Sequence, residues 1–277
     1  MHWQTTRFRI DLGRPQVMGI VNLTPDSFSD GSSHADARAA LAHCEALLRE
    51  GADLLDLGAE SSRPGARPVP LQDELDRLLP VLEGALGLGC PVSVDTTKPE
   101  VMRHALGMGA DIVNDIRALR EPGAVDAVLA HPDSGVCLMH LRGAPASMQD
   151  DPLDAATAVA QVAEFLAERI AAVRGAGVAA QRIVIDPGIG FGKGVAANLA
   201  LLRGQRELLA LGAPLLVGWS RKTTLGALTG RGVADRQAAS VAAALAAVLG
   251  GASIVRVHDV AATVDALKVW RAAGLVG

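Results

Sequence analysis

Val17-Met18-Gly19-Ile20-Val21 is a short apolar run that ends at the polar residue Asn22. An uninterrupted run of this length is typical of a strand that is buried on both faces. Seven further runs have the same design, at residues 54–57, 92–94, 112–113, 136–139, 183–185, 215–217 and 254–257. Each of the eight ends at, or within a few residues of, polar side chains that can do chemistry. Because these polar groups lie at one end only, one end of one sheet is expected to carry the functional site.

Helical patterns fill the intervals between the apolar runs. They cover residues 35–50, 71–86, 99–108, 124–130, 153–176, 198–209, 235–249 and 260–273. Alternating strands and helices imply parallel strands joined by right-handed crossovers. The length, 277 residues, fits one eightfold barrel, for which about 250 residues are typical. The sequence therefore predicts a single (β/α)8 TIM barrel, an α/β fold, with its active site at the C-terminal ends of the strands. No linker interrupts the chain, so residues 1–277 are expected to form one domain with a core at about 15–274.

The composition argues against several classes of protein. Apolar residues make up 49% of the chain and charged residues 20%, which predicts a large core rather than disorder. The net charge is −4 and no basic block is present, so nucleic acid is not an expected partner. No apolar run reaches the roughly 18 residues of a membrane span, and the start of the chain has no apolar signal core. Cys44, Cys90 and Cys137 are widely spaced, which favours buried thiols in a soluble cytoplasmic protein.

Two loops that follow the first two predicted strands are rich in Gly, Pro and Ser. They cover residues 24–31 and 61–68. Long loops at the active end of a barrel are candidates for mobile lids, although ordinary turns would have a similar composition.

Asp95, Asn114 and Asp186 each follow a different predicted strand, and a barrel brings such strand ends together. Two acids and an amide suit a flat heterocycle with several N–H donors, because a carboxylate accepts two parallel N–H bonds. Hydrogen bonds to a charged partner contribute about 1.5–3 kcal/mol each, so two acids can hold a small ring. Alternatively, Asp95 and Asp186 form a general acid–base pair or have structural roles. For Asp111 and Asp115, helix capping or a supporting position behind the site is an equally good explanation.

Lys222, Arg256 and His258 form the cationic counterpart, at the last two predicted strands. In many barrels this corner binds phosphate with help from a helix N-terminus, and the hydroxyl of Ser220 suits such a place. Arg256 lies inside an apolar run, where an unpaired charge would be very costly. Lys222 could instead form a Schiff base or extend to solvent, and His258 could be an ordinary surface residue.

Asn22 ends the first predicted strand with a neutral oxygen that can bind Mg²⁺ together with phosphate oxygens and water, although a turn-forming role is the simpler interpretation. The segment 188–194 is rich in Gly but lacks the GxGxxG spacing and has Gly194 where a phosphate-binding loop needs Ser or Thr. It is expected to let the backbone approach a flat ligand, with Phe191 available for stacking. His140 follows a predicted strand and is a weaker candidate.

Eight motifs of the chain resemble the signatures of the dihydropteroate synthase family of the folate pathway. The two longest are MGIVNLTPDSFSDG at residues 18–31 and DLGAESSRPG at 56–65. The others are SVDT at 93–96, VND at 113–115, LMH at 138–140, DPGIGFGK at 186–193, GWSRK at 218–222 and RVHD at 256–259. They run in family order along nearly the whole chain, and together they are very specific.

The resemblance implies an enzyme that condenses 6-hydroxymethyl-7,8-dihydropterin diphosphate with 4-aminobenzoate, needs Mg²⁺ and forms a homodimer. It implies a pterin site formed by Asp95, Asn114, Asp186 and Lys222. It implies a site for diphosphate and its metal at Asn22, Arg256 and His258, with Asn22 as the metal ligand. It implies an aminobenzoate pocket, where sulfonamides also bind in this family, formed by Phe28, Ser62, Arg63, Pro64, Phe191 and Ser220. The catalytic residues are then Asp95, Lys222, Arg256 and Asn22. Ser62 stands where many members have Thr, which keeps the hydroxyl and loses a methyl group.

The residue types support this chemistry in part. Diphosphate leaves readily only when its charge is neutralised, which Mg²⁺, Arg256 and His258 can do. Its departure leaves a cationic pterin methylene group, which two buried carboxylates would stabilise. The aromatic amine is uncharged at neutral pH and needs positioning more than deprotonation. Three other functions stay open: a pterin-binding methyltransferase with a corrinoid acceptor, a Schiff-base aldolase acting through Lys222, and a non-catalytic binding paralogue.

Overall fold

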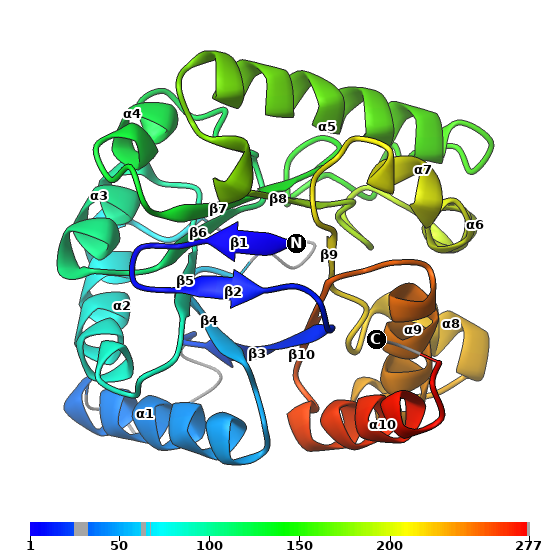
Figure 1. Cartoon of the computed structure of the whole chain (residues 1–277), viewed down its shortest axis with the longest axis horizontal. Helices are drawn as coiled ribbons and strands as arrows, with labels where there is room; N and C mark the ends of the chain where they lie inside the picture. Colours follow the sequence, from blue (N-terminus) through cyan, green and yellow to red (C-terminus); the bar gives the residue numbers. More distant parts are fainter. Residues whose placement is uncertain (25–32, 62–64, 67, 276–277) are drawn as a thin grey trace.

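The structure, a computed structural model, describes residues 1–24, 33–61, 65–66 and 68–275. Eight parallel strands form one sheet in the order β8-β7-β6-β5-β4-β3-β10-β9. They are β3 Gln16–Asn22, β4 Leu54–Gly58, β5 Val92–Asp95, β6 Ile112–Asp115, β7 Gly135–Met139, β8 Ile183–Asp186, β9 Leu216–Val217 and β10 Ile254–Val257. The two outer strands are joined by a parallel bridge between Ile185 and Leu215. The sheet is therefore closed, and the predicted eightfold barrel is confirmed (Figure 1).

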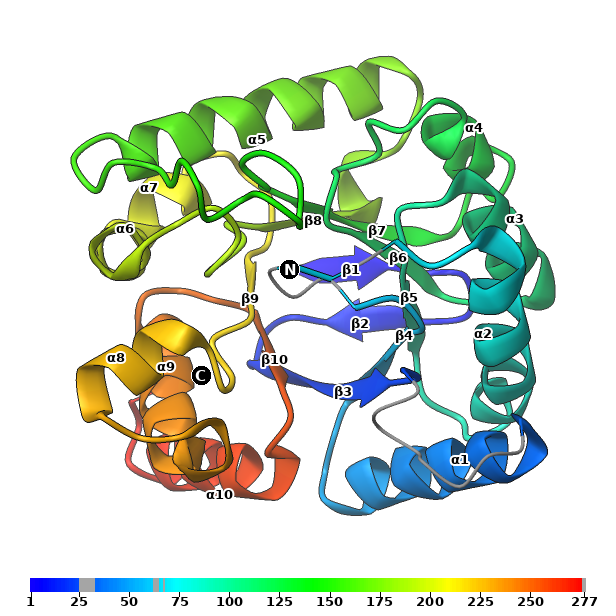
Figure 2. The ribbon, with the colours of Figure 1, turned by 180° about the vertical axis from the view of Figure 1, so that it is seen from behind.

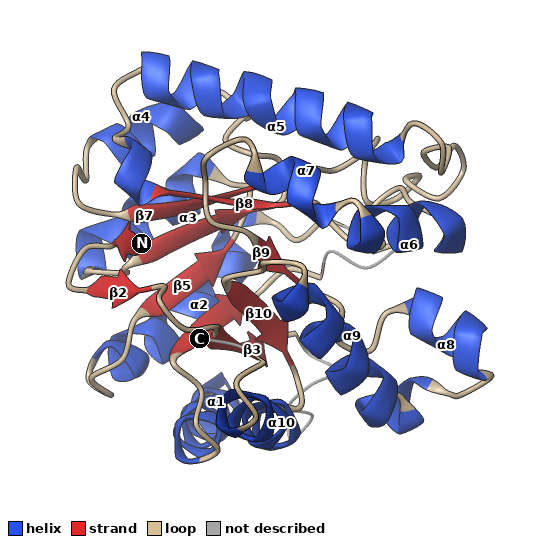
Figure 3. Ribbon diagram, turned by 45° about the vertical axis from the view of Figure 1, so that its right-hand side comes forward, coloured by secondary structure: helices blue, strands red, loops and turns tan. Residues whose placement is uncertain are grey.

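Helices surround the barrel in the end views of Figures 1 and 2, and Figure 3 shows the strands enclosed between them. They are α1 Ser33–Arg49, α2 Leu71–Leu86, α3 Pro99–Met108, α4 Ala124–Leu129, α5 Ala158–Gly175, α6 Val195–Arg203, α7 Gln205–Leu209, α8 Thr223–Thr229, α9 Gln237–Leu249 and α10 Val260–Ala272. Most of these bounds agree with the predicted helices to within two residues. In the described part of the chain, no helix combines the length and the apolar character that crossing a bilayer requires.

Two helices differ from the sequence pattern for a physical reason. The helix expected at residues 153–176 begins only at Ala158, because Leu153 forms a parallel β-bridge with Lys193, in which its N–H group donates to the Gly192 carbonyl at 2.9 Å. The helix expected at residues 198–209 is divided into α6 and α7 at Gly204. A Cβ atom at Gly204 would lie 2.8 Å from a methyl carbon of Val159, so this position is packed closely against α5.

A β-hairpin that the sequence pattern did not predict precedes the barrel. Its strands, β1 His2–Gln4 and β2 Arg9–Asp11, pair antiparallel with Trp3 opposite Ile10. Trp3 is fully buried and donates from Nε1 to the Arg182 carbonyl at 2.9 Å. It joins an apolar cluster with side chains of the strands, including Met18 and Leu54. The hairpin therefore closes the N-terminal end of the barrel, and it lies in front of the strands in Figure 1.

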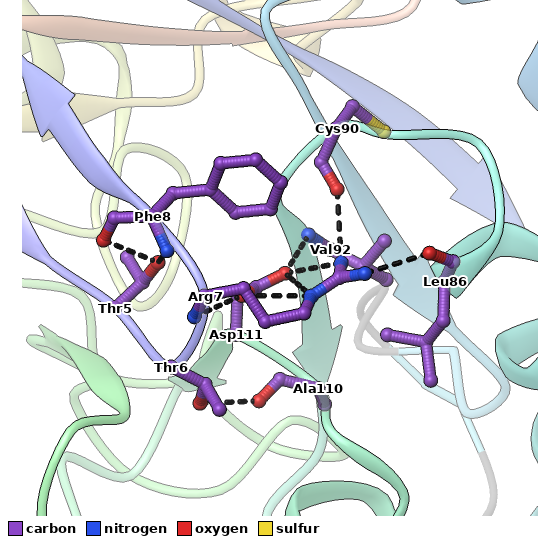
Figure 4. A network of polar contacts seen from close by, with 9 residues as sticks. All are labelled: Thr5, Thr6, Arg7, Phe8, Leu86, Cys90, Val92, Ala110 and Asp111. Carbon is purple, nitrogen blue, oxygen red and sulfur yellow. Dashed lines mark hydrogen bonds and ion pairs between the residues drawn. The ribbon is translucent and has the colours of Figure 1, made fainter.

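An ion pair fastens this hairpin to the barrel (Figure 4). Asp111, fully buried before β6, accepts from Arg7 Nη2 at 2.7 Å and from the backbone N–H groups of Arg7 and Val92, both at 2.9 Å. Arg7 also donates to the carbonyl oxygens of Leu86 and Cys90 at 2.6 and 3.0 Å. Both the carboxylate and the guanidinium group thus have several partners, and this end of the barrel is held by protein contacts alone.

Candidate active site

Polar and charged side chains from four strands meet inside the C-terminal half of the barrel. The register of the sheet places Gly58 beside Asp95 and Asp95 beside Asn114. Arg256, on β10, donates from Nε to Asp56 Oδ2 at 2.6 Å and from Nη2 to Asp95 Oδ2 at 3.0 Å. Asn114 Nδ2 donates to the same Asp56 oxygen at 3.1 Å. Residues as far apart as 56 and 256 therefore form one cluster, in which Arg256 links two carboxylates.

Asp56 is the member of this cluster that the sequence analysis did not select. Its side chain is fully buried, and its Oδ1 atom has no hydrogen-bond partner among the described residues. The available signal was the sequence Leu54-Leu55-Asp56-Leu57, which places a charge inside an apolar strand in the same way as Arg256. Since such a charge needs a partner, the two residues could have been matched to each other.

The surroundings shift the proton affinity of the Asp95–Arg256 pair. Burial raises the pKa of Asp95 to about 7, Arg256 works against that rise, and Asp56 adds to it. Burial disfavours the charge on Arg256, but Asp56 and Asp95 together raise the pKa of its guanidinium group. A carboxylate that titrates near neutral pH, in a cluster with few donors, is suited to receive N–H groups from a ligand.

A second group of side chains lies at the ends of β8 and β9. Asp186 Oδ1 accepts from the Gly188 N–H group at 2.7 Å, and burial raises the pKa of this carboxyl. The ammonium group of Lys222 lies 4.2 Å from the centre of the Phe191 ring, within cation–π distance. Burial lowers the pKa of Lys222 to about 8, and the nearby Asp186 opposes that shift.

Ser220 and His258 connect the ends of β9 and β10. The His258 N–H group donates to Ser220 Oγ at 3.1 Å, and His258 Nδ1 lies 3.0 Å from the same oxygen. The adjacent Arg221 has a φ of 59° and pairs with Asp259, with Nη2 donating at 2.6 Å. The corner that was predicted to bind phosphate is thus held together by two contacts between neighbouring loops, Ser220 with His258 and Arg221 with Asp259.

The glycine-rich segment after β8 packs closely against neighbouring loops. A Cβ atom at Gly188 would lie 2.0 Å from the His140 carbonyl oxygen, and one at Gly192 would lie 2.6 Å from Arg142 Cβ. Both glycines also have positive φ, 66° and 67°. These two glycines therefore allow the chain to pack against itself, and the approach of the backbone to a flat ligand stays a prediction. Phe191 faces Lys222 in this structure.

Asn22 ends β3 and pairs in register with Gly58, two strands away from Asp95. It is half-buried, and its side-chain amide makes no hydrogen bond to any described residue. No group of three or more His, Cys, Asp or Glu side chains with metal-binding geometry occurs in the described ranges. Asp115, by contrast, accepts from the N–H groups of Arg117 and Leu119 at 2.7 and 2.8 Å, which is a capping role.

Four of the predicted site residues lie outside the described residues: Phe28, Ser62, Arg63 and Pro64. The described ends of the second loop are held by an ion network in which Lys98 pairs with Glu60 and Glu74. Glu60 also accepts from the Val69 N–H group at 3.1 Å, which ties the far end of this loop to β4.

Comparison with known proteins shows where this site belongs. A family model for pterin binding enzymes matches residues 18–258. The chain is 52% identical to the dihydropteroate synthase of Neisseria meningitidis serogroup B, over 99% of this chain and 98% of the relative. It is 45% identical to the enzyme of that name from Escherichia coli strain K12, over 95% of this chain and 93% of the relative.

Solved structures agree. Xanthomonas albilineans dihydropteroate synthase with 4-aminobenzoic acid has a TM-score of 0.90 and 52% identity, and the match covers 97% of this chain and 96% of that one. The Burkholderia cenocepacia enzyme complexed with 7,8-dihydropteroate has a TM-score of 0.89 and 49% identity, with 99% and 96% covered. The likeness extends along nearly the whole of each chain, and the chain therefore belongs to the dihydropteroate synthase family of pterin-binding enzymes.

Proposed function

We propose that this protein joins 6-hydroxymethyl-7,8-dihydropterin diphosphate to 4-aminobenzoate, giving 7,8-dihydropteroate and diphosphate. The bond between the pterin methylene carbon and the diphosphate oxygen breaks, the bond from that carbon to the amine nitrogen forms, and the amine releases one proton. The relatives with this activity in their names match nearly full length, and neighbouring structures contain 4-aminobenzoic acid or 7,8-dihydropteroate. The observation that carries the proposal is the cluster in which Arg256 joins Asp56 and Asp95 beside Asn114.

The acids and the amide are suited to the pterin ring. Asp186 and Asp95 can accept its N–H groups, and Asn114 donates from Nδ2 to Asp56, which leaves its amide oxygen available as an acceptor. Lys222, beside Phe191, supplies a donor for a ring carbonyl or nitrogen. When diphosphate departs, the positive charge on the pterin methylene group develops close to Asp95. An ionised Asp95 would stabilise that charge electrostatically.

Arg256 and His258 are suited to the departing diphosphate, because both lie at the end of β10. The residues at this corner offer few protein ligands for a Mg²⁺ ion. Magnesium is commonly held by one or two protein oxygens, with phosphate oxygens and water in the other positions. Asn22 offers one such oxygen, free of other hydrogen bonds to the described residues. The ion would neutralise leaving-group charge, while Asn22 would hold it from the β3 side.

Aminobenzoate needs positioning more than it needs a general base. The aromatic amine is neutral at physiological pH and needs no deprotonation before it attacks. Holding it in line with the breaking bond therefore supplies most of the rate enhancement. Phe28, Ser62, Arg63, Pro64, Phe191 and Ser220 are proposed to shape this place. Ser220 is the member whose hydroxyl is fixed in the structure, through His258.

We also infer a cytoplasmic homodimer. Cys44, Cys90 and Cys137 are all unpaired and buried, which suits a reducing compartment. Leu228, Val233 and Leu249, on or next to α8 and α9, are more than half exposed, and large exposed apolar side chains of this kind are suited to contact with a second copy. Sedimentation of the purified protein at micromolar concentration checks the dimer, and a monomer there would contradict it.

The function is tested by measuring diphosphate release with aminobenzoate present and absent, and with and without Mg²⁺. We expect release that depends on both, with one diphosphate formed for each dihydropteroate. Release at the same rate without aminobenzoate, or a labelled methyl transfer in its place, would contradict the proposal.

A further inference from the structure

A buried lysine lies behind the pterin half of the site. Lys193 is 2% exposed, and its ammonium group contacts four polar atoms from two segments. Nζ donates to the carbonyl oxygens of Gly188 and Phe191, both at 2.9 Å, and to that of His140 at 3.2 Å. It also lies 2.9 Å from His140 Nδ1. Within the described ranges no carboxylate lies at ion-pair distance from it. Burial lowers the pKa of Lys193 to about 7, and the charge of Asp186 opposes that shift.

The state of His140 follows from this contact. Burial, with help from the charge of Lys193, lowers the pKa of His140 to about 3, so the imidazole is neutral. His140, a weaker site candidate from the sequence, thus contacts Lys193 through both its neutral ring and its carbonyl oxygen.

Two of the acceptors of Lys193 belong to residues that hold the site. Gly188 accepts from Lys193 through its carbonyl and donates through its N–H group to Asp186 Oδ1, at 2.7 Å. Phe191 accepts from Lys193 through its carbonyl, and its ring faces the ammonium group of Lys222. Gly188 lies so close to His140 that no larger residue fits. One ammonium group therefore fixes both the donor of the Asp186 carboxylate and the ring beneath Lys222.

We propose that Lys193 is a positioning residue for the pterin substrate: its ammonium group fixes the segment 188–191 and thereby places Asp186 and Phe191. This proposal rests on the proposed function of the site. Lys193 acts through these residues and does not contact substrate. A displacement of about 1 Å in a binding group can cost a factor of a hundred in rate or affinity, so a group that sets such a position has a measurable effect.

Arg182 provides a matched control at the other end of the same strand. It precedes β8, is 4% exposed, and also donates mainly to backbone carbonyls, those of Ser134 at 2.6 Å and of Val128 and His131 at 3.0 Å. Both residues are buried cations without an ion-pair partner in the described part of the chain. They differ in position: Lys193 lies beyond the C-terminal end of β8, where Asp186 is, whereas Arg182 lies at the N-terminal end of this strand.

The test compares the wild type with Lys193→Met, Lys193→Arg and Arg182→Met. The readouts are kcat, the KM for each substrate, and Tm. Lys193→Met is expected to raise the KM for the pterin diphosphate by about tenfold or more, with a smaller change in the KM for aminobenzoate. Lys193→Arg, which keeps the charge and the donors, is expected to restore a large part of the loss. Arg182→Met is expected to lower Tm and to leave both KM values within about twofold of the wild type.

If Lys193→Met does not fold, Lys193→Gln serves the same purpose, because it keeps a donor and removes the charge. A KM for the pterin diphosphate that stays within about twofold of the wild type in either folded variant, while Tm falls as in Arg182→Met, would overturn the proposal. A wild type that forms no dihydropteroate would overturn the function itself, so the two failures are distinguishable.

Discussion

Asp111 and Asp95 are both paired with an arginine, at opposite ends of the barrel. Asp111 lies at the N-terminal end, is fully enclosed, and accepts from Arg7 and from two backbone N–H groups. Asp95 is the last residue of β5, is 16% exposed, and accepts from Arg256 alone among the described residues. A carboxylate with all its acceptor positions used holds the fold, whereas one with positions to spare can bind a ligand. An Asp–Arg pair therefore has a different role at each end of the barrel, and the number of other donors to the carboxylate distinguishes the two roles.

The contrast extends to the whole of each end. The hairpin covers the N-terminal end with Trp3, which donates to the Arg182 carbonyl, and with the Arg7 network, in which Arg7 and Asp111 each have several partners (Figure 4). The C-terminal end contains Asp56 Oδ1, a buried oxygen that lacks a partner among the described residues. A buried carboxylate oxygen without a partner is costly, so Asp56 Oδ1 indicates that the site gives up stability for function.

The largest expected effect comes from Asp95→Asn, with Asp111→Asn as its counterpart at the other end. Asp95→Asn removes the charge next to the developing pterin cation, and we expect kcat to fall by about a hundredfold or more with a small change in Tm. Asp111→Asn should lower Tm and leave kcat within about twofold. Steady-state kinetics and thermal unfolding of both proteins check this. Equal turnover in Asp95→Asn and wild type would remove the distinction between the two ends.

Asp56→Asn tests the residue that the sequence analysis did not select. Asp56 Oδ2 accepts from both Arg256 and Asn114, so its replacement should misplace two groups of the site. Hydrogen bonds to charged groups contribute about 1.5–3 kcal/mol, which corresponds to a loss of about ten- to a hundredfold in kcat/KM for the pterin substrate. Ser93→Ala, on the adjacent strand, is a suitable control with no expected change. A kcat/KM of wild-type size in Asp56→Asn would show that Asp56 has only a structural role.

Arg7→Met sharpens the comparison from the N-terminal side. It leaves Asp111 without its cation but with two backbone donors. We expect a loss of about 2 kcal/mol in unfolding free energy, since the pair is only partly exposed to solvent. For a chain of this size that corresponds to a fall in Tm of about 5 °C. Turnover at 25 °C should not change, and a parallel loss of turnover would show that the two ends are coupled.

The last expected effect is a pH dependence of stability. The pKa of Asp95 is raised to about 7 by burial in the folded protein, against an ordinary value near 3.8. A raised folded pKa gives stability that is present below about pH 4 and is lost as pH rises to about 7. The Tm of the wild type minus that of Asp95→Asn should therefore decline across this window and level off above it. A difference that stays constant from pH 4 to pH 8 would contradict the assigned shift.

The sequence was sufficient for the barrel and for the meeting of its strand ends. Long apolar runs with polar ends identify buried parallel strands because the pattern is local and repeated eight times. The hairpin was missed because each strand has three residues and its alternation, with Trp3 and Ile10 buried between polar neighbours, is too short to stand out. Its stability comes from contacts with Arg182 and Asp111, which are distant in sequence.

The roles within the site were harder to predict than its location. Arg256 and Asp56 each showed a charge inside an apolar strand, yet only the folded chain shows that they are 2.6 Å apart. In the segment 188–194, positive φ and close packing against His140 could not be predicted, because neither can be read from glycine content. Lys193 was overlooked for the same reason, since its acceptor His140 is 53 positions away along the chain.

A structure of the protein with 6-hydroxymethyl-7,8-dihydropterin diphosphate bound tests the division between the two ends most directly. The account predicts a pterin ring within hydrogen-bond distance of Asp95, Asn114 and Asp186, with the diphosphate beside Arg256 and His258. A ligand seated instead at the hairpin end, in the open groove of about 250 Å³ that Phe8 and Arg14 line, would contradict it.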